Sequence, residues 1–166
     1  MTIKPSAIIG QIVLYGAFAA FIGYFATNPR YQHIPAENAL IKLSIAHFGE
    51  RECRKRTTEE LEKLPRNMRN PLDCPRERSP LGVQLDIDGK RAFEKTVQAT
   101  GIAKDGIAAL YKRIELPAGE HQLTVRMSDN ARKEGFPFVK DEKIVLKPQQ
   151  VLVIDFNPDK GGLFFQ

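Results

Sequence analysis

The chain has 166 residues, of which 27% are charged and 42% hydrophobic, and a formal net charge of +5 at pH 7. Its most basic segment, residues 50–78, alternates cations with acids and contains no aromatic residue, which excludes the one-signed, aromatic-bearing surface typical of nucleic-acid binding. Beyond an apolar N-terminal segment about 140 residues remain, enough for one domain with its own core and too few for two of full size.

The N-terminal apolar segment is the strongest signal in the sequence. It runs from Ser6 to Phe25 without a charge, and a helix of this length crosses the hydrocarbon core of a bilayer. Pro5 and Pro29 bound it. We predict a permanent transmembrane helix within residues 1–28. The alternative, a cleavable signal sequence, is disfavoured because the run exceeds an apolar signal region of roughly 7–15 residues and FATNP is a poor cleavage sequence.

The flanks of this segment suggest an orientation. Tyr24 and Tyr31 suit the membrane interface at its C-terminal end, and residues 29–36 form a short linker. The preceding tail carries only Lys4 and the amino group, and so short a tail usually stays in the cytoplasm while the larger C-terminal part is exported. We expect the domain outside the cytoplasm.

One side of the expected helix carries small residues at helical spacing, Gly16, Ala20 and Gly23. Because packing rather than hydrophobicity drives helix association in lipid, this stripe predicts a partner helix. Gln11 adds a polar group that prefers a protein neighbour to lipid. The simpler alternative is that glycine and alanine are common in single spans.

Residues 37–166 are predicted to form a β domain. Alternation between polar and apolar residues across 40–47 indicates its first strand. The pattern then disappears in an insertion, residues 49–80, which is rich in proline. Within it Thr57 and Glu60 form a capping box, which predicts a helix of about two turns through TEELEKL.

Cys53 and Cys74 are the only cysteines and lie in this insertion. An even pair in a loop-rich region favours a disulfide that closes the base of the insertion, and thus an oxidising compartment such as a bacterial periplasm. Together with the tail length, this predicts a bacterial inner membrane with the domain in the periplasm.

After the insertion, short alternating segments return. Asp88-Gly89 between two of them predicts a hairpin, because the glycine can adopt positive φ. LYKRIEL and HQLTVRMS flank the turn 117–120 and are expected to form a second hairpin, and the last two strands, within 136–148 and 149–158, a final pair. The fold class is therefore mainly β, an antiparallel β-sandwich behind a single transmembrane helix.

The run IELPAGEHQLTVRMSDNARKEGFPFVKDEKIVLKPQQVLVIDF resembles the PEGA-like and carboxypeptidase-regulatory-like β-sandwiches of bacterial envelope proteins. The resemblance covers the last third of the chain and implies a transthyretin-like or immunoglobulin-like sandwich of about seven strands, with no activity. The segment ECRKRTTEELEKLPRNMRNPLDCPRERSP is similar to segments of uncharacterised single-span proteins of proteobacterial energy-converting membranes. That similarity implies a partner complex.

Little in the sequence supports catalysis or a cofactor. There is no haem-attachment C-x-x-C-H, phosphate loop, G-x-S-x-G or H-E-x-x-H. Copper bound by the cysteines with Met68, His47 or His121 is the strongest metal hypothesis, but the cysteine spacing fits a disulfide better. Calcium at Asp88, Asp105 and Asp129-Asn130 lacks the D-x-D-x-D-G series and is weaker still. We predict no catalytic residue, no metal and no cofactor.

Two segments are candidates for contact with a partner. The insertion presents charges and prolines, and the residues predicted to dock are Arg66, Met68, Arg69, Arg76 and Arg78. The C-terminal GGLFFQ is an apolar cluster that either folds back onto the sandwich or enters a neighbour.

These features predict a non-catalytic accessory subunit of an inner-membrane energy-converting complex, respiratory or photosynthetic, that docks through its helix and its insertion. Two alternatives remain open. One is an anchored assembly factor that delivers copper to such a complex, and the other is a free-standing envelope module that binds a glycan or a protein.

Overall fold

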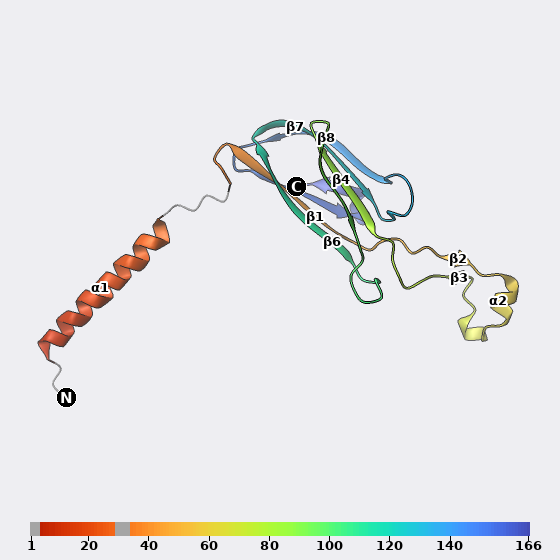
Figure 1. Ribbon diagram of the computed structural model, residues 1–166, viewed down its shortest axis with the longest axis horizontal. Coiled ribbons are helices and arrows are strands. Elements are labelled where there is room, and N and C mark those ends of the chain that lie inside the picture. The colour runs from red at the N-terminus through yellow and green to blue at the C-terminus, as the bar shows by residue number, and fades with distance from the viewer. Residues whose placement is uncertain (1–3, 29–33) are drawn as a thin grey trace. The chain divides into compact units, whose positions relative to one another are not determined.

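The computed structural model describes residues 4–28 and 34–166 and divides the chain into two units, Met1–His33 and Ile34–Gln166 (Figure 1). The first contains helix α1 (Pro5–Thr27), which begins with proline at its first position and ends where the backbone N–H of Asn28 donates to the carbonyl of Tyr24. Pro29 and Tyr31 lie outside the described residues.

Helix α1 is apolar on all sides and buries none of its residues in the protein. Its 23 residues span about 34 Å at 1.5 Å per residue. Its most apolar window has a mean hydropathy of 1.8, and within the described ranges it is the one helix suited to crossing a membrane. By length and composition it is suited to be a membrane anchor or a signal sequence.

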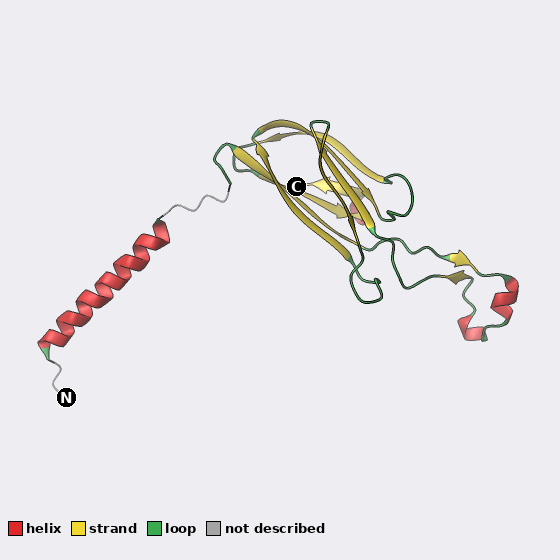
Figure 2. Ribbon diagram, viewed as in Figure 1, coloured by secondary structure: helices red, strands yellow, loops and turns green. Residues whose placement is uncertain are grey.

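The second unit is a β-sandwich of two four-stranded sheets, shown as yellow arrows in Figure 2. One sheet has the order β10-β9-β1-β6 and the other the order β5-β4-β7-β8. Its strands are β1 (Asn38–His47), β4 (Leu81–Ile87), β5 (Lys90–Val97), β6 (Ala108–Pro117), β7 (Gly119–Ser128), β8 (Phe138–Leu146), β9 (Val151–Asn157) and β10 (Gly162–Phe165). The short 3-10 helix η2 (Pro158–Lys160) connects the last two.

The insertion between β1 and β4 extends beyond the sandwich and is called the excursion below (residues 49–80) (Figure 1). It contains a two-stranded ribbon, β2 (Arg54–Lys55) and β3 (Leu72–Asp73), and between these strands helix α2 (Thr58–Glu62) and the 3-10 turn η1 (Arg66–Met68).

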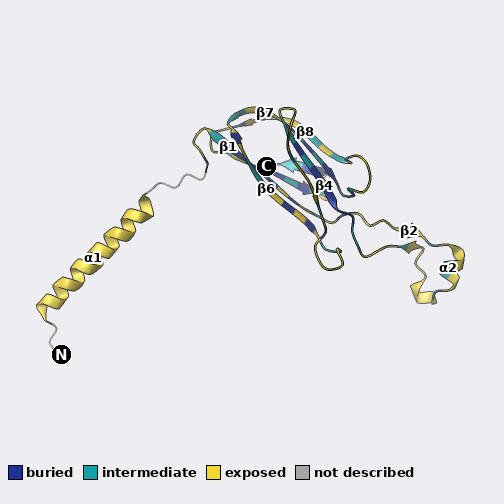
Figure 3. Ribbon diagram, in the orientation of Figure 1, coloured by how far each residue is buried: buried dark blue, intermediate teal, exposed yellow. Residues whose placement is uncertain are grey.

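The core lies between the two sheets and is made of alternate strand residues, dark blue in Figure 3. Ile41, Leu43 and Ile45 of β1 are at most 1% exposed, and Leu123 and Val125 of β7 are fully buried. Full burial of such a side chain is worth about 1.5–3 kcal/mol. The period-two pattern of the sequence therefore corresponds to real burial.

The expected hairpin at Asp88-Gly89 is confirmed. Strands β4 and β5 pair antiparallel, and both turn residues have positive φ, 52° and 74°. The C-terminal apolar cluster folds back: β10 pairs with β9, and Leu163 is buried in the core.

Two other expected pairings are wrong. Strands β6 and β7 meet at a tight turn but belong to different sheets, because β6 pairs with β1 and β7 with β4 and β8. Likewise β8 and β9 are not paired, since β9 lies parallel to β1. The sheets are otherwise antiparallel, and the chain crosses between them twice where sequence patterning indicated hairpins.

Candidate functional site

The excursion is closed at its base by the predicted disulfide between Cys53 and Cys74. The bond joins residues 21 positions apart, and closing such a loop stabilises a fold by about 3 kcal/mol in the chain-entropy model. It also holds β2 and β3 in register, with Arg54 opposite Asp73. No residue of β2, α2, η1 or β3 is buried, so this segment adds nothing to the core.

Polar contacts hold the outer part of the excursion together. Arg54 forms ion pairs with Glu60 at 3.1 Å and with Asp73 at 2.8 Å, and Arg56 pairs with Asp73 at 2.9 Å. The hydrogen bond from Arg56 is the main cause that lowers the pKa of Asp73, and the hydrogen bond from Arg54 is the main cause that lowers the pKa of Glu60. Exposed pairs of this kind stabilise little on their own.

The predicted capping box is present but its helix is shorter than expected. Thr57 Oγ1 accepts from the N–H of Glu60, while the Glu60 carboxylate accepts from the N–H of Thr57. Helix α2 ends at Glu62, short of Pro65, and the side chain of Arg69 donates to the carbonyls of Leu64 (3.1 Å) and Glu62 (3.4 Å) beyond its last turn. Carbonyls at a helix end need such donors.

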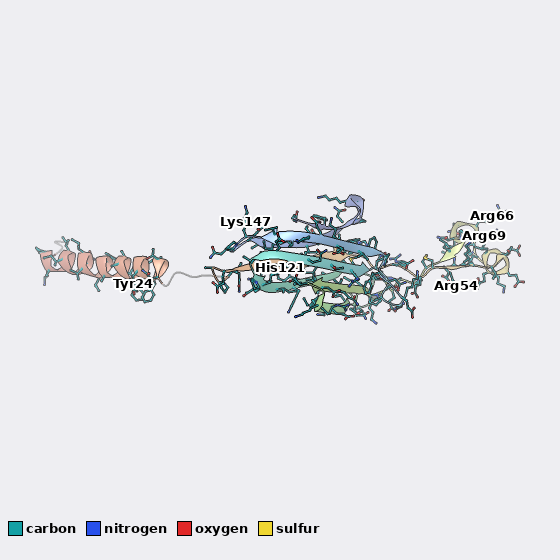
Figure 4. The ribbon with its side chains drawn as sticks, turned by 90° about the horizontal axis from the view of Figure 1, so that it is seen from above. Tyr24, Arg54, Arg66, Arg69, His121 and Lys147 are labelled. Atoms are coloured by element: carbon teal, nitrogen blue, oxygen red, sulfur yellow. A yellow bond between two sulfur atoms is a disulfide. The ribbon has the colours of Figure 1, made fainter. Side chains whose placement is uncertain are left out.

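The five candidate docking residues separate into two groups. Arg66, Met68 and Arg69 lie at the tip of the excursion, with Arg66 and Arg69 shown in Figure 4. Met68 is 60% exposed, and Arg66 makes no hydrogen bond or ion pair with another described residue. Arg69 is engaged with backbone carbonyls. The tip therefore presents one free guanidinium and an exposed thioether.

Arg76 and Arg78 lie at the base. Arg78 is half-buried, donates to the carbonyls of Gly49 (3.1 Å) and Asp105 (3.0 Å), and stacks 4.5 Å from the centre of the Phe48 ring. Arg76 is exposed and pairs with Asp105 at 2.9 Å, which is the main cause that lowers the pKa of that carboxyl. Arg78 thus fastens the excursion to the sandwich.

A polar cluster also fastens the base of the excursion. Asn130 is 2% exposed and donates to Glu50 (3.0 Å) and Glu52 (3.1 Å). Lys133 pairs with Glu50 at 2.7 Å, the main cause that lowers the pKa of Glu50. Beside this cluster lies an open hollow of about 590 Å³ lined by Glu50, Ser128, Asp129, Asn130, Lys133, Glu134, Gly135, Phe136 and Pro137.

The copper hypothesis loses its thiolates, since both cysteines are in the disulfide. The two histidines of this hypothesis, His47 and His121, lie at different ends of the sandwich strands. His47 packs on Phe156, and desolvation lowers its pKa, whereas His121 bonds to Asp88 at 2.7 Å, which raises its pKa. Across residues 4–28 and 34–166, no three metal-ligating side chains form a cluster.

On α1, Gly16, Ala20 and Gly23 are exposed, and no protein atom outside the helix lies within 4 Å of where a side chain at either glycine would begin. A partner helix at this stripe remains a prediction.

The segment TGIAKDGIAA, whose glycines indicate a surface loop, also carries Ile102, a fully exposed residue that was not among the predicted contact residues. The available signal was an isolated isoleucine between glycines in an otherwise polar segment, TGIAKDG.

No known family model matches the chain, and neither the curated proteins nor the solved structures contain a significant match to it.

Proposed function

We propose that this protein is a non-catalytic accessory subunit of a larger bacterial inner-membrane complex, with its N-terminus in the cytoplasm and its sandwich in the periplasm. Helix α1 anchors it and contacts a partner helix through Gly16, Ala20 and Gly23. The tip of the excursion docks on an extramembrane subunit. A respiratory or photosynthetic complex is the proposed assembly, on the similarity of the excursion sequence to proteins of energy-converting membranes.

One observation carries this proposal: a disulfide-closed segment that extends beyond the sandwich and buries none of the residues of its helix, turn or strands. A chain that orders about twenty residues without adding to its core loses conformational entropy without gaining burial. Contact with another molecule supplies the missing burial. Met68 and Arg66 at the tip are residue types suited to protein interfaces.

The disulfide supports the periplasmic placement, because such bonds persist in oxidising compartments. The apolar length of α1 supports an anchor.

The test is purification of the tagged full-length protein from its native membranes in mild detergent, with size separation and mass spectrometry of the associated chains. Stoichiometric recovery in one large complex supports the proposal, and recovery as a single small protein refutes it. Two variants then assign the contacts. Gly16→Leu with Gly23→Leu blocks close helix approach, and Met68→Ser with Arg66→Ser removes the tip contacts.

A matched control keeps these variants interpretable. Lys140 and Val145 lie on β8, far along the chain from the excursion, and Val145 is exposed. Val145→Ser should leave the complex intact. If it releases the protein as readily as the tip variant does, the tip is not the docking site.

A further inference from the structure

A second contact surface lies where the excursion leaves the sandwich. Past the last registered pair of β1 and β6, His47 with Ala108, come Phe48 and Ile107, both exposed. The adjoining outward positions of the same two strands are Ala46 opposite Ala109, and Ser44 opposite Tyr111. Phe48 is 49% and Tyr111 60% exposed. Ala46 and Ala109 thus lie between two exposed aromatic residues on this end of the sheet. The loop that carries Ile102 adjoins them, because the N–H of Arg78, whose guanidinium covers Phe48, donates to the carbonyl of Lys104 (2.9 Å). Together these residues are called the base patch below (Ser44, Ala46, Phe48, Ile102, Ile107, Ala109 and Tyr111).

Ile102 of the base patch stands in a loop that is held rigid. Two hydrogen bonds of Thr100 close this loop. Its carbonyl accepts from the N–H of Gly106 (2.9 Å), and its hydroxyl donates to the carbonyl of Ile107 (2.8 Å). A side chain at Gly106 would begin only 2.4 Å from that hydroxyl, so the loop is closely packed. An apolar side chain displayed on a preorganised loop loses little entropy on binding.

Cations surround the base patch. Arg76 pairs with Asp105 at 2.9 Å, Lys104 pairs with Glu77 at 3.9 Å, and the half-buried Arg78 covers Phe48. Arg51 is close enough to Asp105 to help lower the pKa of that carboxyl, behind the larger effect of Arg76. The cations Arg51, Arg76, Arg78 and Lys104 thus outnumber the carboxylates Asp105 and Glu77, which leaves positive charge next to exposed apolar side chains.

The geometry points to a docking surface for an acidic, amphipathic segment of a partner protein, whose apolar side chains cover Phe48 and Ile102 while its carboxylates meet Arg76 and Lys104. Apolar centre and charged rim are the ordinary anatomy of such contacts. The surface lies at the His47 end of β1, about 30 Å along the strand from Asn38 at 3.3 Å per residue.

This inference rests on the proposed function and adds a second contact to the tip. The full-length protein carries the photo-crosslinking residue p-benzoylphenylalanine in place of Ile102, or in place of Val145 as a control, and is irradiated in its native membranes. Mass spectrometry then sequences the peptide joined to it. We expect one predominant adduct from position 102, on a peptide with at least two carboxylates beside apolar residues, and little from position 145.

The adduct refutes the inference if it is lipid, a second copy of this chain or a basic segment, or if the two positions give equal yields. If the complex is recovered intact but position 102 gives no adduct, the base patch is not a contact and the proposed function stands. If no complex is recovered at all, the proposed function itself fails.

A second measurement tests the charge. Ile102→Asp and Ile102→Lys both remove the apolar side chain, and neither disturbs packing because Ile102 touches nothing in the core. Because binding buries the isoleucine, both variants should lose roughly 10- to 100-fold in affinity for the partner complex. Against an acidic segment the aspartate variant loses more, and the difference shrinks in high salt. Equal losses, or a greater loss for lysine, would overturn the assignment of an acidic partner.

Discussion

Loss of the disulfide should unfold the excursion and leave the sandwich folded. Without the bond between Cys53 and Cys74, the 21-residue interval must be closed by the short β2–β3 ribbon and by exposed ion pairs, while the lost closure entropy is about 3 kcal/mol. Because 1.4 kcal/mol is a factor of ten, amides within residues 54–73 should exchange roughly 100-fold faster in the Cys53→Ser/Cys74→Ser variant. The core strands share no buried contact with this ribbon and should keep their protection.

The assay is native-state hydrogen exchange of the full chain in detergent, read by mass spectrometry, with wild type in the presence of a reductant as the matched comparison. Peptides from β1, β4 and β7 serve as the internal control. The reasoning is refuted if exchange in the core strands rises with that in the excursion, since the two would then unfold as one unit. Unchanged protection of residues 54–73 would refute it as well.

Three further predictions concern the sandwich, and each is measured by chemical unfolding of the full chain in detergent followed by circular dichroism. Ile41→Ala empties a fully buried position and should lower the free energy of unfolding by about 2–5 kcal/mol, whereas the exposed Val145→Ala should change it by less than about 0.5 kcal/mol; equal effects would contradict the assigned core. Gly49→Ala places a methyl group 1.9 Å from the carbonyl oxygen of Ser79, so it should destabilise far more than Gly82→Ala, which meets its neighbours at an ordinary 3.5 Å; a harmless Gly49→Ala would disprove this close approach. Because Asp88 raises the pKa of His121, the stability that His121 supplies is complete below its unfolded pKa of about 6.5 and is lost as pH rises through the folded value, so wild type should exceed His121→Gln by more at pH 5.5 than at pH 8. A wild-type advantage over His121→Gln that grows with pH would contradict the assigned bond to Asp88. For His47 the sign is opposite: burial lowers its pKa, so its contribution to stability is lost as pH falls through the folded value.

Sequence patterning predicted the strands well but not their partners. Alternation located β1 and β4 because each buries one face, and Asp88-Gly89 identified a hairpin because its turn requires positive φ at both residues. The turn Pro117-Ala118-Gly119 carries a similar local signal, yet it connects strands of opposite sheets. A tight turn can connect two paired strands or pass the chain from one sheet to the other. Which of these occurs depends on β1 and β4, the distant strands with which β6 and β7 pair.

The candidate docking residues show the same limit. The sequence grouped Arg66 with Arg78 because both are arginines of one basic segment. In the structure Arg78 is held by Phe48 and by two carbonyls at the base, whereas Arg66 is free at the tip among the described residues. Only tertiary contacts distinguish an arginine that builds the segment from one that is presented by it. The disulfide was predictable because cysteine spacing carries its own evidence.

The path of β1 has a mechanical consequence. This strand receives the chain from α1 at Asn38 and passes it to the excursion beyond His47, and it lies inside its sheet between β6 and β9. A pull between an anchored helix and a docked excursion would therefore run along β1 and load its ladders in shear. Ten residue pairs with β6 and four with β9 would have to slide together before the strand moved. Under such a pull the sandwich would transmit tension along β1 without unravelling strand by strand.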